Sequence, residues 1–180
     1  MRKVFQLPNV LTMTRLIGAV VLIFIKPLSK PFFVVYLLCG FSDVLDGFVA
    51  RRTHSESEFG AKLDSVADLT FYGIMLIKIL PILWGMLPGW VWYFVGVALL
   101  IRLCSYGTAI VKFRRFASLH TYLNKLTGLM LFIVPLILCT KIAVWYCVTV
   151  VVVACAASLQ ELLIHIFSKN YDPNQKKIKS

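Results

Sequence analysis

The sequence predicts an all-α, polytopic membrane protein with six transmembrane helices and a short N-terminal interfacial helix. Of its 180 residues, 59% are hydrophobic, which is more apolar surface than a water-soluble domain of this size can bury. The apolar residues form six continuous runs without the alternation of a β-barrel, so helices are the expected spanning form. We predict one membrane domain over residues 1–168, followed by a basic cytoplasmic tail over 169–180.

The six runs follow one another with clear breaks. An interfacial helix is expected over residues 2–8. The basic start resembles a signal peptide, but Arg15 interrupts the first run and no small-residue cleavage site follows, so a retained span is expected. Pro27 and Pro31 separate the first two runs, and Pro88 lies in the turn before the fourth. The expected spans cover residues 10–26, 32–50, 63–83, 90–111, 122–140 and 142–167.

The formal net charge of +11 is distributed as a topology signal. Twelve Lys and Arg residues lie at one end of the expected bundle and three at the other, so the positive-inside rule places both termini and the loop 51–61 in the cytoplasm. No basic stretch is interleaved with stacking aromatics, so no nucleic-acid partner is expected. The sequence therefore indicates an integral protein, which we assign to a bacterial cell membrane.

Four aspartates lie within the cytoplasmic ends of the second and third runs: Asp43, Asp46, Asp64 and Asp68. A carboxylate inside a span is costly unless it faces a cavity, a partner or a metal. Spacings of three and four residues place each pair on one helix face, and a short connecting loop lets the two faces oppose each other. Oxygen-only ligands of this kind suit Mg²⁺ or Mn²⁺ rather than zinc. The pattern predicts a metal site able to grip a pyrophosphate.

Small residues and one cation surround these aspartates. Gly47 allows close approach of a ligand, Ala50 extends the same face, and Gly60 suits a turn that keeps the entrance open. Arg51, one turn beyond Gly47, is placed to bind phosphate oxygens.

The segment SDVLDGFVARRTHSESEFGAKLDSVADL resembles the signature of the CDP-alcohol phosphotransferase (CDP-alcohol phosphatidyltransferase) family, Asp-x2-Asp-Gly-x2-Ala-Arg-x8-Gly-x3-Asp-x3-Asp. Every fixed position matches, and the opening LPNVLTMTR is similar to the family's N-terminal Pro-Asn-x2-Thr-x2-Arg segment. The resemblance implies a membrane enzyme of phospholipid biosynthesis, usually a homodimer. Such an enzyme transfers a phosphatidyl group from CDP-diacylglycerol to a polar alcohol and releases CMP.

The resemblance also implies residue roles. The four aspartates would bind Mg²⁺ or Mn²⁺, and Asp68 would also be the general base. Residues that would line the CDP pocket are Asp43, Gly47, Ala50, Arg51 and Gly60. From the first span, Asn9, Thr12 and Arg15 would approach the pyrophosphate.

The acceptor alcohol is less well defined. Cations in and after the fourth run, which suit a phosphate-bearing acceptor, are Arg102, Lys112, Arg114, Arg115 and Lys125. This pattern is similar to phosphatidylglycerophosphate synthases, which favours glycerol 3-phosphate. The second aspartate pair reads DSVADL, closer to phosphatidylserine synthases, so serine and inositol-type acceptors remain alternatives. Topological anchoring is an equal explanation for the Arg114 and Arg115 pair.

Two other classes of protein compete with the enzyme hypothesis. A cation channel or carrier also places carboxylates in the membrane, but it distributes them through the bilayer depth and does not require the glycines and Arg51 at fixed offsets. A non-catalytic scaffold that kept the fold is the second alternative. Release of CMP distinguishes the enzyme from both.

Overall fold

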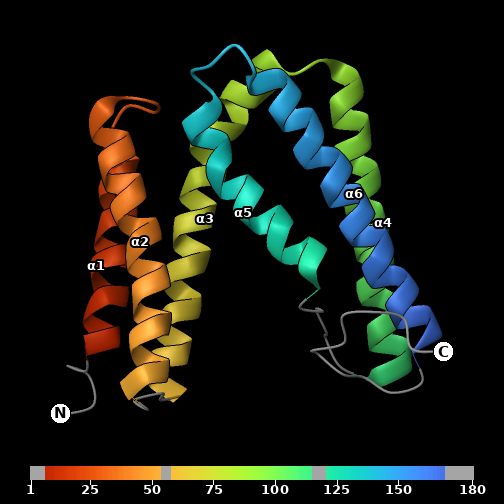
Figure 1. Ribbon diagram of the computed structural model, residues 1–180, viewed down its shortest axis with the longest axis horizontal. Coiled ribbons are helices and arrows are strands. Elements are labelled where there is room, and N and C mark those ends of the chain that lie inside the picture. The colour runs from red at the N-terminus through yellow and green to blue at the C-terminus, as the bar shows by residue number, and fades with distance from the viewer. Residues whose placement is uncertain (1–6, 54–57, 115–120, 169–180) are drawn as a thin grey trace. The chain divides into compact units, whose positions relative to one another are not determined.

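In a computed structural model, which describes residues 7–53, 58–114 and 121–168, the chain forms α-helices and no strand in these ranges (Figure 1). The predicted all-α fold is confirmed. The helices are α1 (Leu7–Phe24), α2 (Lys30–Thr53), α3 (Glu58–Met86), α4 (Gly89–Phe113), α5 (Tyr122–Ile137) and α6 (Ala143–Phe167). They form two compact units, Met1–Gly85 and Met86–Ser180, which are described separately.

In the first unit, α1, α2 and α3 lie side by side (Figure 1). Leu28 adopts a left-handed backbone with φ of 58° in the connection between α1 and α2. The Ser29 hydroxyl then accepts a hydrogen bond from the Phe32 amide at 3.4 Å, which begins α2. From α3, the Lys78 ammonium donates to the Ile25 carbonyl at 2.6 Å. This bond ties the third helix to the chain just after α1.

Close contact between α1 and α2 depends on a glycine. A Cβ atom added at Gly18 would lie 2.6 Å from the sulfur of Cys39, a distance that real Cβ contacts do not show. The buried Cys39 sulfur also lies 3.8 Å from the carbonyl oxygen of Arg15, to which it donates. The two helices therefore pack together at a small-residue position, as helices in membranes commonly do.

An aromatic stack joins α2 to α3. The rings of Phe32 and Tyr36 are stacked with centroids 5.9 Å apart, and those of Tyr36 and Phe71 with centroids 5.6 Å apart. All three side chains are buried. This stack fixes the faces that α2 and α3 present to each other. It therefore also sets which polar residues face each other near the α2–α3 connection.

In the second unit, α6 packs against both α4 and α5 (Figure 1). The helix α4 ends at Arg114, whose φ of 53° breaks the helical backbone. At the start of α5, the Thr121 side chain accepts a hydrogen bond from the Asn124 amide at 3.2 Å. This N-cap satisfies one of the otherwise unpaired amides of the first turn.

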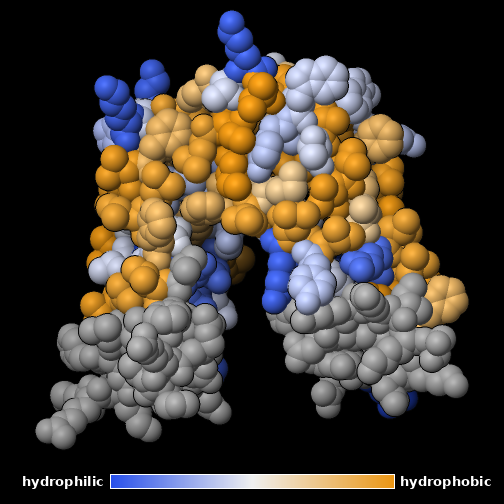
Figure 2. All heavy atoms as spheres, viewed as in Figure 1, coloured by the Kyte–Doolittle hydropathy of each residue, from blue (hydrophilic) through white to orange (hydrophobic). Residues whose placement is uncertain are grey.

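The helices present apolar side chains to their surroundings. Figure 2 shows apolar residues over most of the visible described surface of each unit, and many large ones, including Leu69, Ile77 and Val111, are well exposed. Three helical stretches are long and apolar enough to cross a membrane: Lys62–Met86, Gly89–Lys112 and Ala143–Phe167. Val10–Phe24 and Tyr122–Ile137 are shorter apolar helices. The chain is thus an integral membrane protein by composition and length, and the count of six spans stays a prediction.

The helices overrun the apolar runs where the motif residues lie. The predicted loop over 51–61 is wrong, because α2 continues to Thr53 and α3 begins at Glu58. The polar residues on either side of this short connection therefore belong to the last turn of α2 and the first turn of α3. Of the interfacial helix predicted over 2–8, only residues 7 and 8 are described, and both belong to α1.

Candidate metal and nucleotide site

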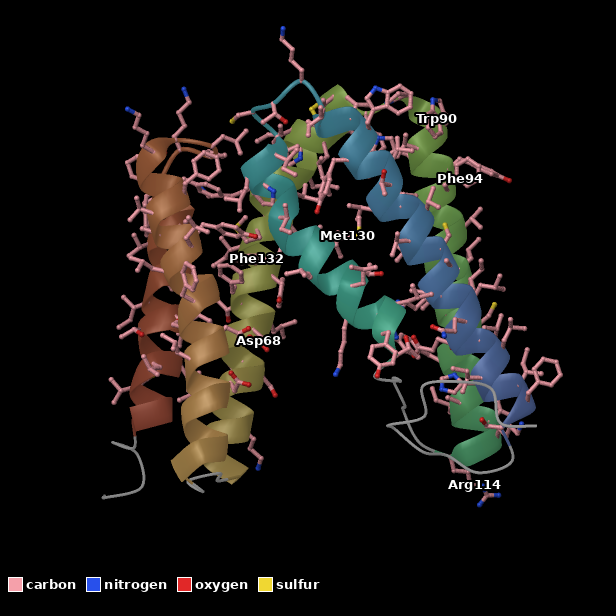
Figure 3. The ribbon with its side chains drawn as sticks, viewed as in Figure 1. Asp68, Trp90, Phe94, Arg114, Met130 and Phe132 are labelled. Atoms are coloured by element: carbon pink, nitrogen blue, oxygen red, sulfur yellow. The ribbon has the colours of Figure 1, made fainter. Side chains whose placement is uncertain are left out.

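Three carboxylates from two helices converge at one place in the first unit. Asp43 lies on α2, and Asp64 and Asp68 lie one turn apart on α3; Figure 3 labels Asp68. One carboxylate oxygen of each lies within 4.8 Å of the other two. The three side chains are 44%, 45% and 42% exposed, respectively. The predicted opposition of the two aspartate faces is therefore found for these three residues.

A buried cation lies against the same carboxylates. Arg15, on α1, is 1% exposed. Its Nη1 donates to Oδ1 of Asp43, its Nη2 donates to Oδ1 of Asp64, and Nη2 lies 3.3 Å from Oδ1 of Asp68. All three helices of the first unit thus contribute to one charged cluster.

The donor set fits a hard divalent cation. Mg²⁺ and Mn²⁺ prefer carboxylate oxygens, and three such oxygens lie close enough to share one ion or a pair. Three negative charges at this spacing repel one another, and one guanidinium offsets only part of that charge. A cation bound by Asp43, Asp64 and Asp68 would remove the remaining repulsion.

The other predicted residues of this site lie on the same three helices. Gly60 is in the first turn of α3, at the helix start where it was expected. On α1, Thr12 is buried at 3% exposure, one turn before Arg15. Several further residues have helical backbones, but their side chains fall outside the described part of the structure: Asn9 on α1, and Asp46, Gly47, Ala50 and Arg51 on α2.

Of the predicted acceptor-binding residues, Arg102 lies in a buried polar cluster of the second unit. Its Nη2 is 3.2 Å from Oε2 of Glu161 on α6, and its Nε donates to the Tyr106 hydroxyl at 3.2 Å. The Asn124 amide of α5 donates to the same Glu161 oxygen at 2.9 Å. Glu161 is fully buried and Arg102 is 28% exposed. One carboxylate therefore links all three helices of this unit.

The remaining acceptor-site candidates have different surroundings. The Lys112 ammonium donates to the carbonyls of His165 and Ile166, at 3.1 Å and 2.6 Å, and so caps the last turn of α6. Arg114 ends α4 and points away from it (Figure 3). Lys125 is exposed in the first turn of α5. Arg115 lies outside the described residues.

Sequence reasoning missed the partner of Arg102 and the position of Arg15. The signal for Glu161 was present, because it is a lone carboxylate within an apolar run and needs a compensating cation. Arg15 was expected to approach a pyrophosphate, and the structure places its guanidinium on the aspartates. Spacing along α1 alone does not say which face of that helix meets α2.

Comparison with known proteins shows which family the chain resembles. A family model described as CDP-alcohol phosphatidyltransferase matches residues 5–159. A CDP-diacylglycerol–serine O-phosphatidyltransferase of Methanocaldococcus jannaschii is 37% identical over 73 residues, 41% of this chain and 34% of that protein. A CDP-diacylglycerol–glycerol-3-phosphate 3-phosphatidyltransferase of Escherichia coli K12 is 38% identical over 80 residues, 42% of this chain and 44% of that protein. No solved structure matches the chain.

These alignments span between a third and a half of the two relatives. A third relative, a cardiolipin synthase (CMP-forming)/mitochondrial hydrolase fusion protein of Schizosaccharomyces pombe, is 36% identical over 76 residues, 41% of this chain and 13% of that protein.

Proposed function

Because the chain belongs to the CDP-alcohol phosphatidyltransferase family, we propose that it transfers a phosphatidyl group from CDP-diacylglycerol to a polar alcohol and releases CMP. The observation that carries this proposal is the convergence of Asp43, Asp64 and Asp68 from two helices. All three belong to the family motif, and the single positive charge of Arg15 offsets only part of their combined negative charge.

The residues divide the work of the reaction between them. Asp43, Asp64 and Asp68, with Asp46, hold Mg²⁺ or Mn²⁺. Such a cation would supply positive charge to the diphosphate of CDP-diacylglycerol and to departing CMP. Gly47, Ala50, Arg51 and Gly60 line the nucleotide side of the pocket, with Asn9 and Thr12 approaching from α1.

Asp68 is the proposed general base. Its carboxylate takes the proton of the acceptor hydroxyl as that oxygen attacks the lipid-side phosphorus. The bond between this phosphorus and the bridging oxygen breaks, and CMP leaves with the electron pair. No side chain becomes covalently attached to the phosphatidyl group.

Glycerol 3-phosphate is the proposed acceptor. It would give phosphatidylglycerophosphate, and the Escherichia coli relative is a glycerol-3-phosphate 3-phosphatidyltransferase. The cations predicted for the acceptor phosphate are Arg102, Lys112, Arg114, Arg115 and Lys125; of these, Arg102 pairs with Glu161 and Lys112 caps α6. Serine is the second candidate, because the Methanocaldococcus jannaschii relative is a serine O-phosphatidyltransferase. We place the site and both termini on the cytoplasmic side, because most Lys and Arg residues lie at that end.

The test uses inverted membrane vesicles, whose outer face is the cytoplasmic one. Vesicles containing the protein receive CDP-diacylglycerol, Mg²⁺ or Mn²⁺, and glycerol 3-phosphate, serine or inositol in parallel. We expect CMP release and one new phospholipid, identified by mass spectrometry, with glycerol 3-phosphate. Asp68→Asn should lower the rate by about 10²-fold or more, because general-base catalysis contributes on that scale.

A matched control is Ser65→Ala, which changes an exposed residue one turn from Asp68 on α3 and should keep most of the rate. Product formed from serine alone would replace the acceptor assignment but keep the reaction class. Absence of CMP with every acceptor, or an Asp68→Asn variant as fast as the parent, would contradict the proposal.

A further inference from the structure

We propose that Arg15 is a positioning residue for the metal site. Its guanidinium holds the carboxylates of Asp43, Asp64 and Asp68 from their buried side and leaves their exposed side to the cation. This inference rests on the proposed function only in that the three carboxylates bind a divalent cation.

The contacts of Arg15 join all three helices of the first unit at one point. Nη1 bonds the aspartate of α2, and Nη2 bonds Asp64 and contacts Asp68 on α3. A guanidinium presents several donors in one rigid plane, so a single group can hold carboxylates that approach from different helices. A lysine at this position carries the same charge but has no such fork.

Burial separates the two sides of the cluster. The Arg15 side chain is 1% exposed, whereas the three aspartate side chains are 42–45% exposed. A cation from solution therefore reaches the carboxylates from the side opposite Arg15. Arg15 contacts the Oδ1 atom of each of the three aspartates, so one guanidinium orients all three carboxylates.

The neighbouring packing keeps Arg15 in place. The Cys39 sulfur donates to the Arg15 carbonyl, and Gly18 lets α1 lie against α2 one turn further on. The backbone that carries Arg15 is thus held by contacts other than those of its side chain. Groups that orient metal ligands in this way typically change metal affinity by about 10- to 100-fold when they are lost.

The decisive variant is Arg15→Lys, because it keeps the positive charge and removes the fork. The full chain in nanodiscs is titrated with Mn²⁺ alone, and free Mn²⁺ is measured by electron paramagnetic resonance. We expect the Mn²⁺ dissociation constant of Arg15→Lys to rise about tenfold or more. Arg15→Gln should bind Mn²⁺ at least as weakly as Arg15→Lys.

Lys78→Gln is the matched control. It removes another partly buried cation of the same unit, which bonds the Ile25 carbonyl and, within the described ranges, no carboxylate, so Mn²⁺ affinity should stay at the parent value. Thermal unfolding in chelator identifies any variant that has lost its fold. If the Arg15 variants have lost their fold, Asp64→Glu serves instead. It lengthens the side chain of one predicted metal ligand while Arg15 stays intact, and it should also weaken Mn²⁺ binding.

The outcomes separate this inference from the proposed function. Parent affinity in Arg15→Lys, or tighter binding in Arg15→Gln, would overturn the positioning role, the second result by showing that Arg15 competes with the cation. A parent protein that binds no Mn²⁺ would overturn both the role and the metal site. Arg15-dependent Mn²⁺ binding without CMP release would leave the positioning role standing and reject the transferase activity.

Discussion

At the residue scale, the molecule places ionised side chains in apolar helices by giving each one a compensating group. Arg15 forms ion pairs with Asp43, Asp64 and Asp68. Glu161 pairs with Arg102 and accepts a hydrogen bond from Asn124. A buried charge without a partner costs several times more than a surface charge, so these pairings decide where the polar residues can lie. The two clusters differ in burial, because the aspartates are partly exposed and Glu161 is not.

Glu161→Gln tests the second pairing. The variant removes the charge that compensates Arg102 while keeping an acceptor for Asn124, and we expect a loss of about 3 kcal/mol in the free energy of unfolding. Arg102 keeps some access to water, which places the loss at the lower end of the usual range. Chemical denaturation in detergent micelles measures it.

The double variant Arg102→Gln/Glu161→Gln supplies the control for this prediction. With both charges gone, part of the stability should return, since neither group is left uncompensated. Losses that simply add would show that the ion pair does not stabilise the second unit.

The shared face of Asp64 and Asp68 was predictable because an i, i+4 spacing fixes a helix face whatever the tertiary structure, and the short α2–α3 connection let Asp43 be expected opposite them. The placement of Arg15 and the Arg102–Glu161 pair were not, because both depend on helix rotation. Rotation is set by packing, such as the Tyr36–Phe71 stack and the Gly18–Cys39 contact. No periodicity in a uniformly apolar run reports it.

At the element scale, hydropathy located all six helices but misplaced several of their ends, including the two nearest the motif, where α2 runs to Thr53 and α3 begins at Glu58. The runs end where polar motif residues begin, whereas α2 and α3 continue through those residues. Backbone hydrogen bonding does not require apolar side chains, so an apolar run marks the membrane-embedded part of a helix rather than the whole helix. The overrun places Gly60 and the surrounding motif within regular helix.

The α1–α2 contact makes a second prediction at this scale. In Gly18→Ala, the new methyl group meets the Cys39 sulfur, so the first unit should become less stable. Changing Cys39→Ala as well should make room for that methyl group. We expect Gly18→Ala to cost about 1–3 kcal/mol more in the Cys39 background than in the Cys39→Ala background.

Thermal or denaturant unfolding of the four proteins of this cycle gives the coupling energy. Gly107→Ala is a suitable control, because a Cβ at this helical position on α4 meets no atom within 4 Å. A coupling energy near zero for the Gly18–Cys39 pair would mean that the two helices do not pack as described.

At the scale of the whole molecule, the apolar helix surfaces and the charged aspartate cluster both suit a lipid substrate with a charged head. The apolar exterior places the helices in lipid, and the described carboxylates Asp43, Asp64, Asp68 and Glu161 pair with arginines inside their own units. A lipid substrate such as CDP-diacylglycerol has the same division, with acyl chains in the bilayer and a charged diphosphate at its surface. A membrane enzyme can bind both parts without extracting the lipid. The homodimer implied by the family resemblance stays a prediction.

We propose that the aspartate cluster acts through a divalent cation. The most direct test of this proposal is CMP release from CDP-diacylglycerol by the purified parent protein and by Asp64→Asn, first in chelator and then with Mg²⁺ or Mn²⁺ restored. We predict no release in chelator, full recovery of the parent on adding metal, and little recovery of Asp64→Asn at the same metal concentration. Equal rates with and without chelator, or an Asp64→Asn variant that matches the parent, would contradict the account.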